Sequence, residues 1–310
     1  MFITETMKGK IDSLEKALDA IKRFQCEAGR IYDTNLERGL IECFYRGQAN
    51  YEWDIMPSVF RDNHLALESE YYNELVRSRP DEFLNMSDFE KLQKMQHYNL
   101  PTRLLDITRN PLVALYFACQ PYEDTESRKK LDGKFILFSS EKLHPEDAKV
   151  RAIVALAMLP GYNNNCDCFR EIGAEPDDLE RYLDDDYVVN PSMTNERITS
   201  QSGAFILFGN HKMHSDPETD DVMGSCESRC SINNIEKNGH PLKQAPEGVM
   251  GGSFKYPKCY IYRVPSNAKK GILDELKTLN ISEDVLFPSL SNSAKAVVDK
   301  YSEYRESLHD

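Results

Sequence analysis

The sequence lacks two features that would assign it to a broad class at once. It contains no run of eighteen or more apolar residues, so we expect no membrane-spanning helix. It is also short of positive charge, with 38 Lys and Arg against 51 Asp and Glu, a formal net charge of −13. This balance argues against a general nucleic-acid-binding or anionic-membrane surface, although it leaves room for a small basic pocket.

The chain also lacks the signatures of several common enzymes and of exported proteins. There is no P-loop, no glycine pattern of a dinucleotide-binding fold, no nucleophile elbow and no kinase motif. The N-terminal stretch has no charged-then-apolar signal region, so we expect a cytoplasmic protein whose eight cysteines are reduced. Cys226 and Cys230 lie near His211 and His214, but their spacing matches no strong zinc template. We therefore expect no metal.

What is present is the composition of a folded protein and a mixture of helix and strand signals. Apolar residues make up 40% of the 310 residues and charged residues 29%, which favours a globular chain over a disordered one. Residues 11–25 repeat apolar positions at helical spacing. Ser87 begins a capping box with Glu90, and Asn110 precedes Pro111 as a helix cap would.

Helical and strand segments follow one another without a regular alternation. Short runs rich in β-forming residues predict strands at 40–48, 103–108, 134–140, 202–209 and 258–264. We therefore expect an α+β fold with mixed, mainly antiparallel sheets flanked by helices.

The composition along the chain suggests one principal domain. We expect a helical N-terminal lead at 1–30 and a core at 31–209. A weakly patterned stretch at 210–254 predicts an irregular insertion. Residues 255–310 would then supply a strand and helices that complete the same domain.

The strand at 40–48 ends in FYRGQ, which places a planar cation beside bare backbone. The guanidinium of Arg46 suits bidentate contact to a phosphate or carboxylate. Gly47 permits close approach of a ligand or of another strand. The competing interpretation is that Arg46 pairs with a carboxylate of its own chain.

A second polar group interrupts the apolar segment QHYNLPTRLLDITRNPLVALYFA, residues 96–118. His97 lies where a helix is expected to stop, and Arg103 and Asp106 fall on opposite faces of the strand that follows. Each charge needs its own partner, because burying an unpaired charge is very costly. A structural ion-pair network, with Arg46 or Arg61 as the mate of Asp106, is the alternative to a binding site.

A third polar position precedes the strand at 202–209. In NERITSQSGAFILF the amide of Gln201 offers both a donor and an acceptor. Its structural interpretation is an amide that stabilises a turn.

Together these segments resemble the FRG domain family, named for its Phe/Tyr-Arg-Gly motif. The resemblance rests on FYRGQ, on the Trp, Pro-Ser and Arg of residues 53–61, and on the long segment from QHYNLPTRLLDIT to NPLVALYFA. RITSQSGAF and the later GILDEL and LFPSLSNSAK extend it over roughly residues 20–300. Membership implies a bacterial protein of the kind that often lies near defence or toxin genes, so a role in phage defence or as a toxin is an expectation.

The order of these motifs is similar to that of ADP-ribosyltransferases, which implies a similar fold and NAD as the substrate. On this analogy the catalytic residues would be Arg46, His97, Asp106 and Gln201. The residues that bind NAD would be Tyr45, Arg46, Gly47, Gln48, Ser58, Arg61, Thr102 and Arg103.

Gln201 would occupy the position of the late glutamate of such enzymes, and an amide can neither act as a base nor supply charge to a sugar cation. The alternative function is a non-catalytic module that binds a nucleotide or another phosphate-bearing small molecule. The acceptor, a protein or a nucleic acid, is not indicated by the sequence. A third interpretation is a protein whose polar core only fixes its fold.

Overall fold

The structure, a computed structural model, describes residues 4–32, 41–62, 64–158, 182, 185–191, 199–209 and 258–288. The expected insertion at 210–254 and the group around Cys226 lie outside these residues. Along the chain the elements are β1 (Thr4–Lys10), α1 (Leu14–Tyr32), β2 (Ile41–Gln48), η1 (Ser58–Phe60), η2 (His64–Leu67), α2 (Glu68–Ser78), η3 (Pro80–Phe83), α3 (Asp88–His97), β3 (Leu104–Thr108), α4 (Pro111–Ala118), β4 (Gly133–Leu143), α5 (Ala148–Met158), β5 (Tyr187–Val189), β6 (Gly203–Leu207), β7 (Lys258–Val264), α10 (Lys269–Thr278) and α11 (Glu283–Leu286).

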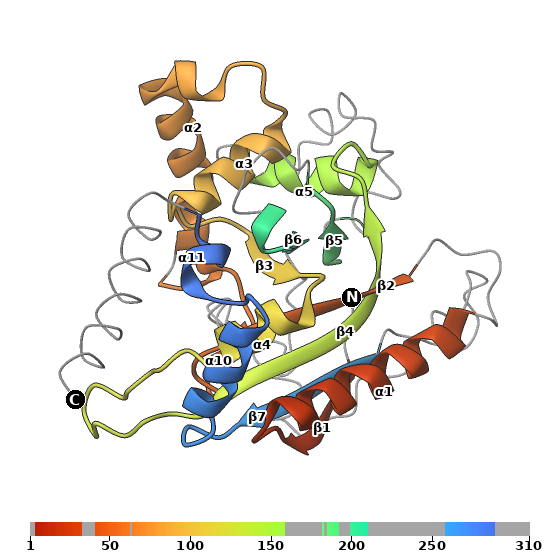
Figure 1. Cartoon of the computed structure of the whole chain (residues 1–310). Helices are drawn as coiled ribbons and strands as arrows, with labels where there is room; N and C mark the ends of the chain where they lie inside the picture. Colours follow the sequence, from red (N-terminus) through yellow and green to blue (C-terminus); the bar gives the residue numbers. More distant parts are fainter. Residues whose placement is uncertain are drawn as a thin grey trace, which may run out of the picture.

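The strands form one sheet in the order β1-β7-β4-β2-β3-β6-β5, and β4 also pairs with β5. This extra pairing closes β4, β2, β3, β6 and β5 into a ring, so the sheet is barrel-like. The β1–β7 and β4–β5 pairs are parallel and the others are antiparallel. The predicted α+β class with mainly antiparallel strands is therefore confirmed. The long, curved β4 runs through both halves of the sheet (Figure 1).

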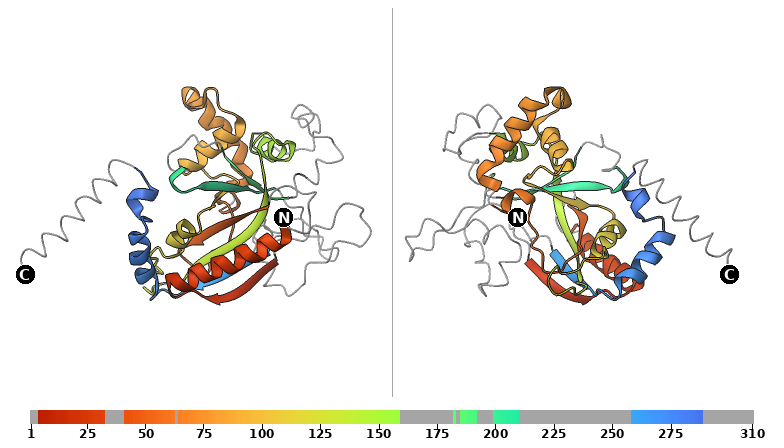
Figure 2. Two further views of the ribbon diagram at one scale, coloured as in Figure 1. Left: turned by 45° about the vertical axis from the view of Figure 1, so that its right-hand side comes forward. Right: turned by 90° about the vertical axis from the view of Figure 1, so that its left-hand side faces the viewer.

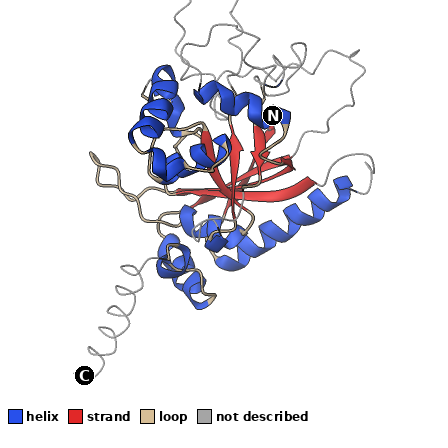
Figure 3. Cartoon of the chain, turned by 90° about the horizontal axis from the view of Figure 1, so that it is seen from above, coloured by secondary structure: helices blue, strands red, loops and turns tan. Residues whose placement is uncertain are grey.

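Helices cover the outside of the curved sheet in two groups (Figures 2 and 3). One apolar core joins α1, α4 and α10 to β2, β4 and β7. A second joins α2, α3 and α5 to β3, β5 and β6. The third core lies between the inner faces of the strands and includes Ile55, Met56, Val59 and Phe60 from the segment after β2. That segment therefore fills part of the interior that β2 and β3 face.

Local signals set the ends of the two helices that flank β3. The hydroxyl of Ser87 accepts from the backbone N–H of Glu90, whose carboxylate accepts from the N–H of Ser87, so the predicted capping box begins α3. The side chain of Asn110 accepts from the N–H of Leu112 and Pro111 occupies the first turn of α4. These two helices fix where β3 begins and ends.

The N-terminal segment differs from the predicted helical lead in one respect. The helix is present as α1, but it is preceded by β1, which pairs with β7 at the edge of the sheet. Of the five apolar positions in the predicted repeat, Ile11, Leu14, Ile21 and Phe24 are buried against the first core, whereas Leu18 is exposed.

Candidate functional site

The side chains of β2 alternate between two environments. Phe44 faces the interior core, and Arg46 and Gln48 share that face because successive strand residues point to opposite sides. Tyr45 packs instead into the core formed with α4, and its hydroxyl accepts from Gln25 Nε2 at 2.9 Å. Burial is the main cause that raises the pKa of Tyr45 to about 12. Tyr45 therefore lies on the opposite face from Arg46 and is removed from a ligand held there.

Gly47 serves the approach of a helix rather than of a ligand. A Cβ built on Gly47 would lie 1.8 Å from the carbonyl oxygen of Ala114 in α4. Gly133, on the neighbouring β4, would meet the carbonyl oxygen of Ala118 at 1.9 Å. The helix thus lies so close to the sheet that only glycine fits beneath it, and this contact accounts for the glycine of FYRGQ.

Arg46 joins β2 to β3, two strands that share little backbone pairing. Tyr45 and Thr108 are the only register pair recorded for these strands in the described residues. Beyond it, Arg46 Nη1 donates to the backbone carbonyl of Asp106. Arg46 is half-buried, and its Nε is buried with no hydrogen-bond partner in the described part of the chain. Burial lowers the pKa of Arg46 to about 10, opposed by the nearby Asp106 and assisted by the like charge of Arg61.

A chain of hydrogen bonds orients the carboxylate of Asp106, which is exposed. Gln96 Nε2 donates to Asp106 Oδ2 at 3.0 Å, and Thr102 Oγ1 donates to Gln96 Oε1 at 2.7 Å. The backbone N–H of Thr102 in turn donates to Ser58 Oγ at 3.2 Å. Ser58, Thr102 and Asp106 were predicted from the sequence, and the structure brings them together with Arg46. Gln96 was not predicted, although it is the first residue of the motif that contains Thr102 and Asp106.

The remaining residues near Arg46 anchor the segment after β2. Arg61 Nη2 donates to the carbonyl of Met56 at 2.8 Å, and its side chain is exposed. Gln48 Nε2 donates to the carbonyl of Asp54 at 3.1 Å, while Gln48 Oε1 is buried without a partner among the described residues. Neither Arg46 nor Arg61 forms an ion pair with any residue that the structure describes. The charges that act on Arg46 from the described residues are thus the Asp106 carboxylate, which forms no ion pair with it, and the like charge of Arg61.

Arg103 occupies a different place from the predicted one. It is 1% exposed, and its Nε and Nη2 donate to the two carboxylate oxygens of Glu68, which is 5% exposed. Arg103 Nη1 donates to the carbonyl of Phe208 at 3.1 Å. These contacts occupy the guanidinium in a buried ion pair, so we correct the expectation that Arg103 contacts a phosphate: it joins β3 to α2. Glu68 was not predicted, because its burial depends on how α2 packs.

Gln201 and His97 are held by other contacts. Gln201 Nε2 donates to the carbonyl of Leu286 at 3.0 Å, so its amide ties the turn before β6 to α11. His97, the last residue of α3, is half-buried and its ring meets that of Tyr98 edge to face at 5.5 Å. Of the four predicted catalytic residues, Arg46 and Asp106 are joined directly, by the hydrogen bond from Arg46 Nη1 to the Asp106 carbonyl.

The residues that the structure describes contain no group of three or more His, Cys, Asp and Glu placed to hold a metal ion. No helix in them is long and apolar enough to cross a membrane.

Comparison with known proteins identifies the region that carries these side chains. A family model described as the FRG domain matches residues 42–127, which contain Arg46, Ser58, Gln96, Thr102 and Asp106. No curated protein and no solved structure matches the chain. Residues 42–127, from β2 to the loop after α4, are therefore the part of the chain that belongs to the FRG domain family.

Proposed function

We propose that the FRG domain binds NAD through Arg46 and Arg61 and transfers its ADP-ribosyl group to an acceptor. The observation that carries the proposal is Arg46, whose Nε is buried without a hydrogen-bond partner in the described residues and on which the like charge of Arg61 acts. A bound anion would accept from the unused donor and offset the like charges. A diphosphate supplies two negative groups at a spacing that guanidinium forks can hold.

Asp106 is the group that would assist the transfer. In the reaction the bond from ribose C1′ to the nicotinamide nitrogen breaks, and its electron pair leaves with nicotinamide. The acceptor nucleophile forms the new bond to C1′ and gives up its proton. The exposed carboxylate of Asp106, held by Gln96, would stabilise the sugar cation and take that proton. This assignment replaces Gln201, whose amide could do neither.

The alternative is a module that binds the same ligand without turnover. It is favoured by Gln201, because an amide occupies the position at which the analogous enzymes carry their late glutamate. The two proposals share the anion site and differ only in whether a bond is broken.

Incubation of the purified protein with NAD labelled in the adenosine part tests both. We expect transfer of label to total cell protein or nucleic acid, with release of nicotinamide, and loss of both in Arg46→Ala. Binding of NAD without release, also lost in Arg46→Ala, would establish the module. Absence of binding to a folded protein would refute the anion site.

The proposed bacterial setting, in phage defence or as a toxin, has its own test. Induced expression of the wild-type chain in bacteria should slow growth or reduce phage yield, and Asp106→Asn should relieve the effect if transfer is its cause. Equal effects of wild type and Asp106→Asn at equal protein level would contradict a catalytic toxin.

A further inference from the structure

An aromatic pair stands exposed beside the strand that carries Arg46. Trp53, the only tryptophan of the chain, is 41% exposed, and Tyr122 is 36% exposed. Their ring centroids lie 4.8 Å apart at an interplanar angle of 67°. Trp53 lies in the loop after β2 and Tyr122 in the loop after α4, so two separate segments bring these rings together.

Two buried lysines hold these loops in place. Lys269 is 4% exposed, and its Nζ donates to the carbonyl of Ala49 at 2.6 Å and to that of Gln120 at 3.0 Å, one carbonyl from each loop. Lys134 is 3% exposed, and its Nζ donates to the carbonyl of Trp53 itself at 2.7 Å. Burial of an ammonium costs free energy. Here the hydrogen bonds of the two buried ammonium groups offset that cost and hold the backbone of the loops that carry the exposed rings.

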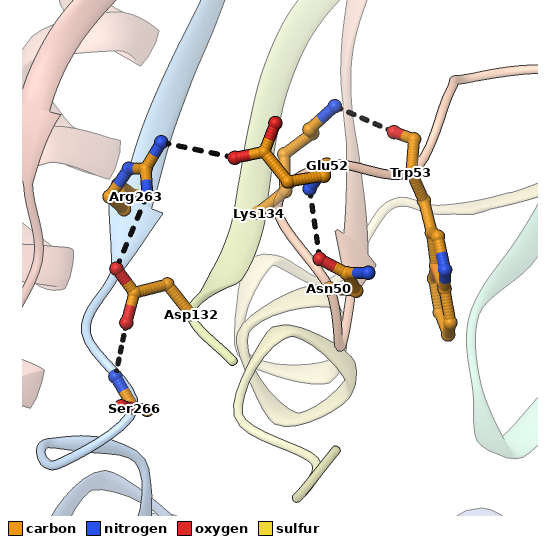
Figure 4. Close-up of polar contacts among 7 residues, drawn as sticks. All are labelled: Asn50, Glu52, Trp53, Asp132, Lys134, Arg263 and Ser266. Atoms are coloured by element: carbon orange, nitrogen blue, oxygen red, sulfur yellow. Dashed lines mark hydrogen bonds and ion pairs between the residues drawn. The ribbon is translucent and has the colours of Figure 1, made fainter. Parts of the chain in front are cut away.

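Direct contacts between the loops add to this rigidity. The backbone N–H of Tyr51 donates to the carbonyl of Asp132 at 2.7 Å, and the ring of Tyr51 lies 3.8 Å from the guanidinium carbon of Arg263. Figure 4 shows Glu52 directed toward Arg263 and the indole of Trp53 directed away from it. The ionic contacts therefore lie on one side of the loop and the indole on the other.

The loop is also tied to the anion site. Gln48 donates to the carbonyl of Asp54, the residue after Trp53. Gln48 and Arg46 are two residues apart on one face of β2, which is about 7 Å along a strand. The buried Gln48 Oε1, without a partner in the described residues, lies between Arg46 and this loop along the chain. Along β2 and the loop that follows, the order is therefore a guanidinium, an amide oxygen without a partner in the described residues, and the indole of Trp53.

We propose that Trp53 and Tyr122 form a stacking surface for the adenine ring of the nucleotide whose phosphates Arg46 and Arg61 hold, an inference that rests on the proposed function. Aromatic side chains bind bases through their π faces, and rings held in place beforehand lose little conformational freedom on binding. The free N–H groups of the adenine edge match an acceptor such as Gln48 Oε1.

The single tryptophan makes the test direct, because all indole emission of the wild-type chain comes from Trp53. The protein is titrated with NAD, with AMP and with nicotinamide mononucleotide. We expect NAD and AMP to change the emission and nicotinamide mononucleotide, which lacks the purine, to leave it unchanged. A response to nicotinamide mononucleotide alone, or to none of the three, would overturn the stacking surface.

Variants then separate this proposal from the proposed function. By calorimetry Tyr122→Ala and Trp53→Ala should each weaken NAD binding by about tenfold. Trp53→Phe, which keeps a ring, should weaken it less, and Leu84→Ala, at an exposed apolar residue remote from β2 in sequence, should have no effect. If NAD affinity depends on Arg46 but is unchanged in Trp53→Ala and Tyr122→Ala, the stacking surface is wrong and the proposed function stands. If AMP changes the emission but NAD is neither bound through Arg46 nor cleaved, the stacking surface stands and the proposed function is wrong.

Discussion

Arg46 Nη1 donates to the backbone carbonyl of Asp106, so the side chain proposed to hold a phosphate also joins two strands whose backbone pairing is short. This double role means that loss of Arg46 affects both binding and stability. The carbonyl is the partner of Arg46 in place of an ion pair among the described residues. Because a carbonyl carries only a partial charge, most of the guanidinium charge is left to act on a ligand.

Arg46→Lys separates the two roles. The ammonium keeps the charge but loses the planar fork, so NAD affinity should fall by about tenfold or more, because hydrogen bonds to charged groups contribute roughly 1.5–3 kcal/mol. Calorimetry measures the affinity and thermal unfolding the stability. Arg79→Lys, at an exposed arginine that follows α2, is the matched control. Equal affinity of wild type and Arg46→Lys would show that no bidentate contact is made.

Asp106→Asn tests the proposed role of the carboxylate with little change in shape. An amide can still accept from Gln96 Nε2, so we expect an unchanged unfolding temperature and unchanged NAD affinity, with ADP-ribosyl transfer reduced by about 10²-fold or more. Gln96→Leu removes the donor and leaves Asp106 charged but unoriented, so transfer should fall by a smaller factor. Full activity of Asp106→Asn would exclude this carboxylate.

The buried ion pair of Arg103 and Glu68 predicts a strong non-additivity. Arg103→Met leaves the carboxylate of Glu68 buried without its partner and should lower the free energy of unfolding by about 3–5 kcal/mol. Glu68→Leu should cost a similar amount, while the double variant should cost much less than the sum, because both charges are then gone. Chemical denaturation of all four proteins measures this.

An exposed ion pair provides the control for that cycle. Arg77 and Glu74 on α2 are 75% and 64% exposed in their side chains. Arg77→Ala should leave the free energy of unfolding nearly unchanged, since exposed pairs contribute little. Additive costs for Arg103→Met and Glu68→Leu would contradict the pairing.

Local signals in the sequence predicted much of the fold. Features that depend on packing between distant segments could not be predicted in this way. The caps at Ser87 and Asn110 and the apolar spacing of α1 act within a few residues, so the sequence displays them. β1 was missed because it has no alternating apolar pattern and its partner β7 lies about 250 residues away along the chain.

In the candidate site, too, the sequence indicated local features but not the partners that long-range packing supplies. Strand alternation correctly indicated that Arg103 and Asp106 need separate partners, but only the packing of α2 identifies Glu68 as one of them. Gln96 reaches Asp106 because α3 returns toward β3, which no spacing within the motif shows. For Gly47 the sequence suggested the approach of a ligand or of another strand, and the structure places a helix, α4, there instead.

Gly47→Ala is expected to destabilise the fold strongly. The added methyl group would overlap the backbone carbonyl of Ala114, which cannot move without shifting α4, so we expect a loss of about 3 kcal/mol. Gly271 in α10 is the matched control, because a Cβ there meets no atom within 4 Å. Gly271→Ala should stabilise by about 0.5–1 kcal/mol, the usual gain within a helix. Thermal and denaturant unfolding measure both, and a neutral Gly47→Ala would contradict the close approach.

Tyr45 predicts a specific loss of stability at alkaline pH. Its pKa is raised from 10.0 to about 12 in the folded protein, chiefly by burial, so the unfolded chain gives up the phenol proton first. The contribution of Tyr45 is therefore fully present below pH 10 and is lost as the pH rises from 10 toward 12, by about 1.4 kcal/mol per pH unit.

Tyr45→Phe cannot ionise, so its free energy of unfolding should fall less than that of the wild type across this window. Denaturant titrations at intervals between pH 9 and pH 12 measure the difference between the two proteins, which should be constant below pH 10 and change steadily above it. Phe44→Leu, at the preceding buried position of β2, carries no titratable group and should differ from the wild type by a constant amount. A constant difference for Tyr45→Phe as well would mean that the phenol is open to water in the folded protein, and that Tyr45 does not belong to the core beneath α4.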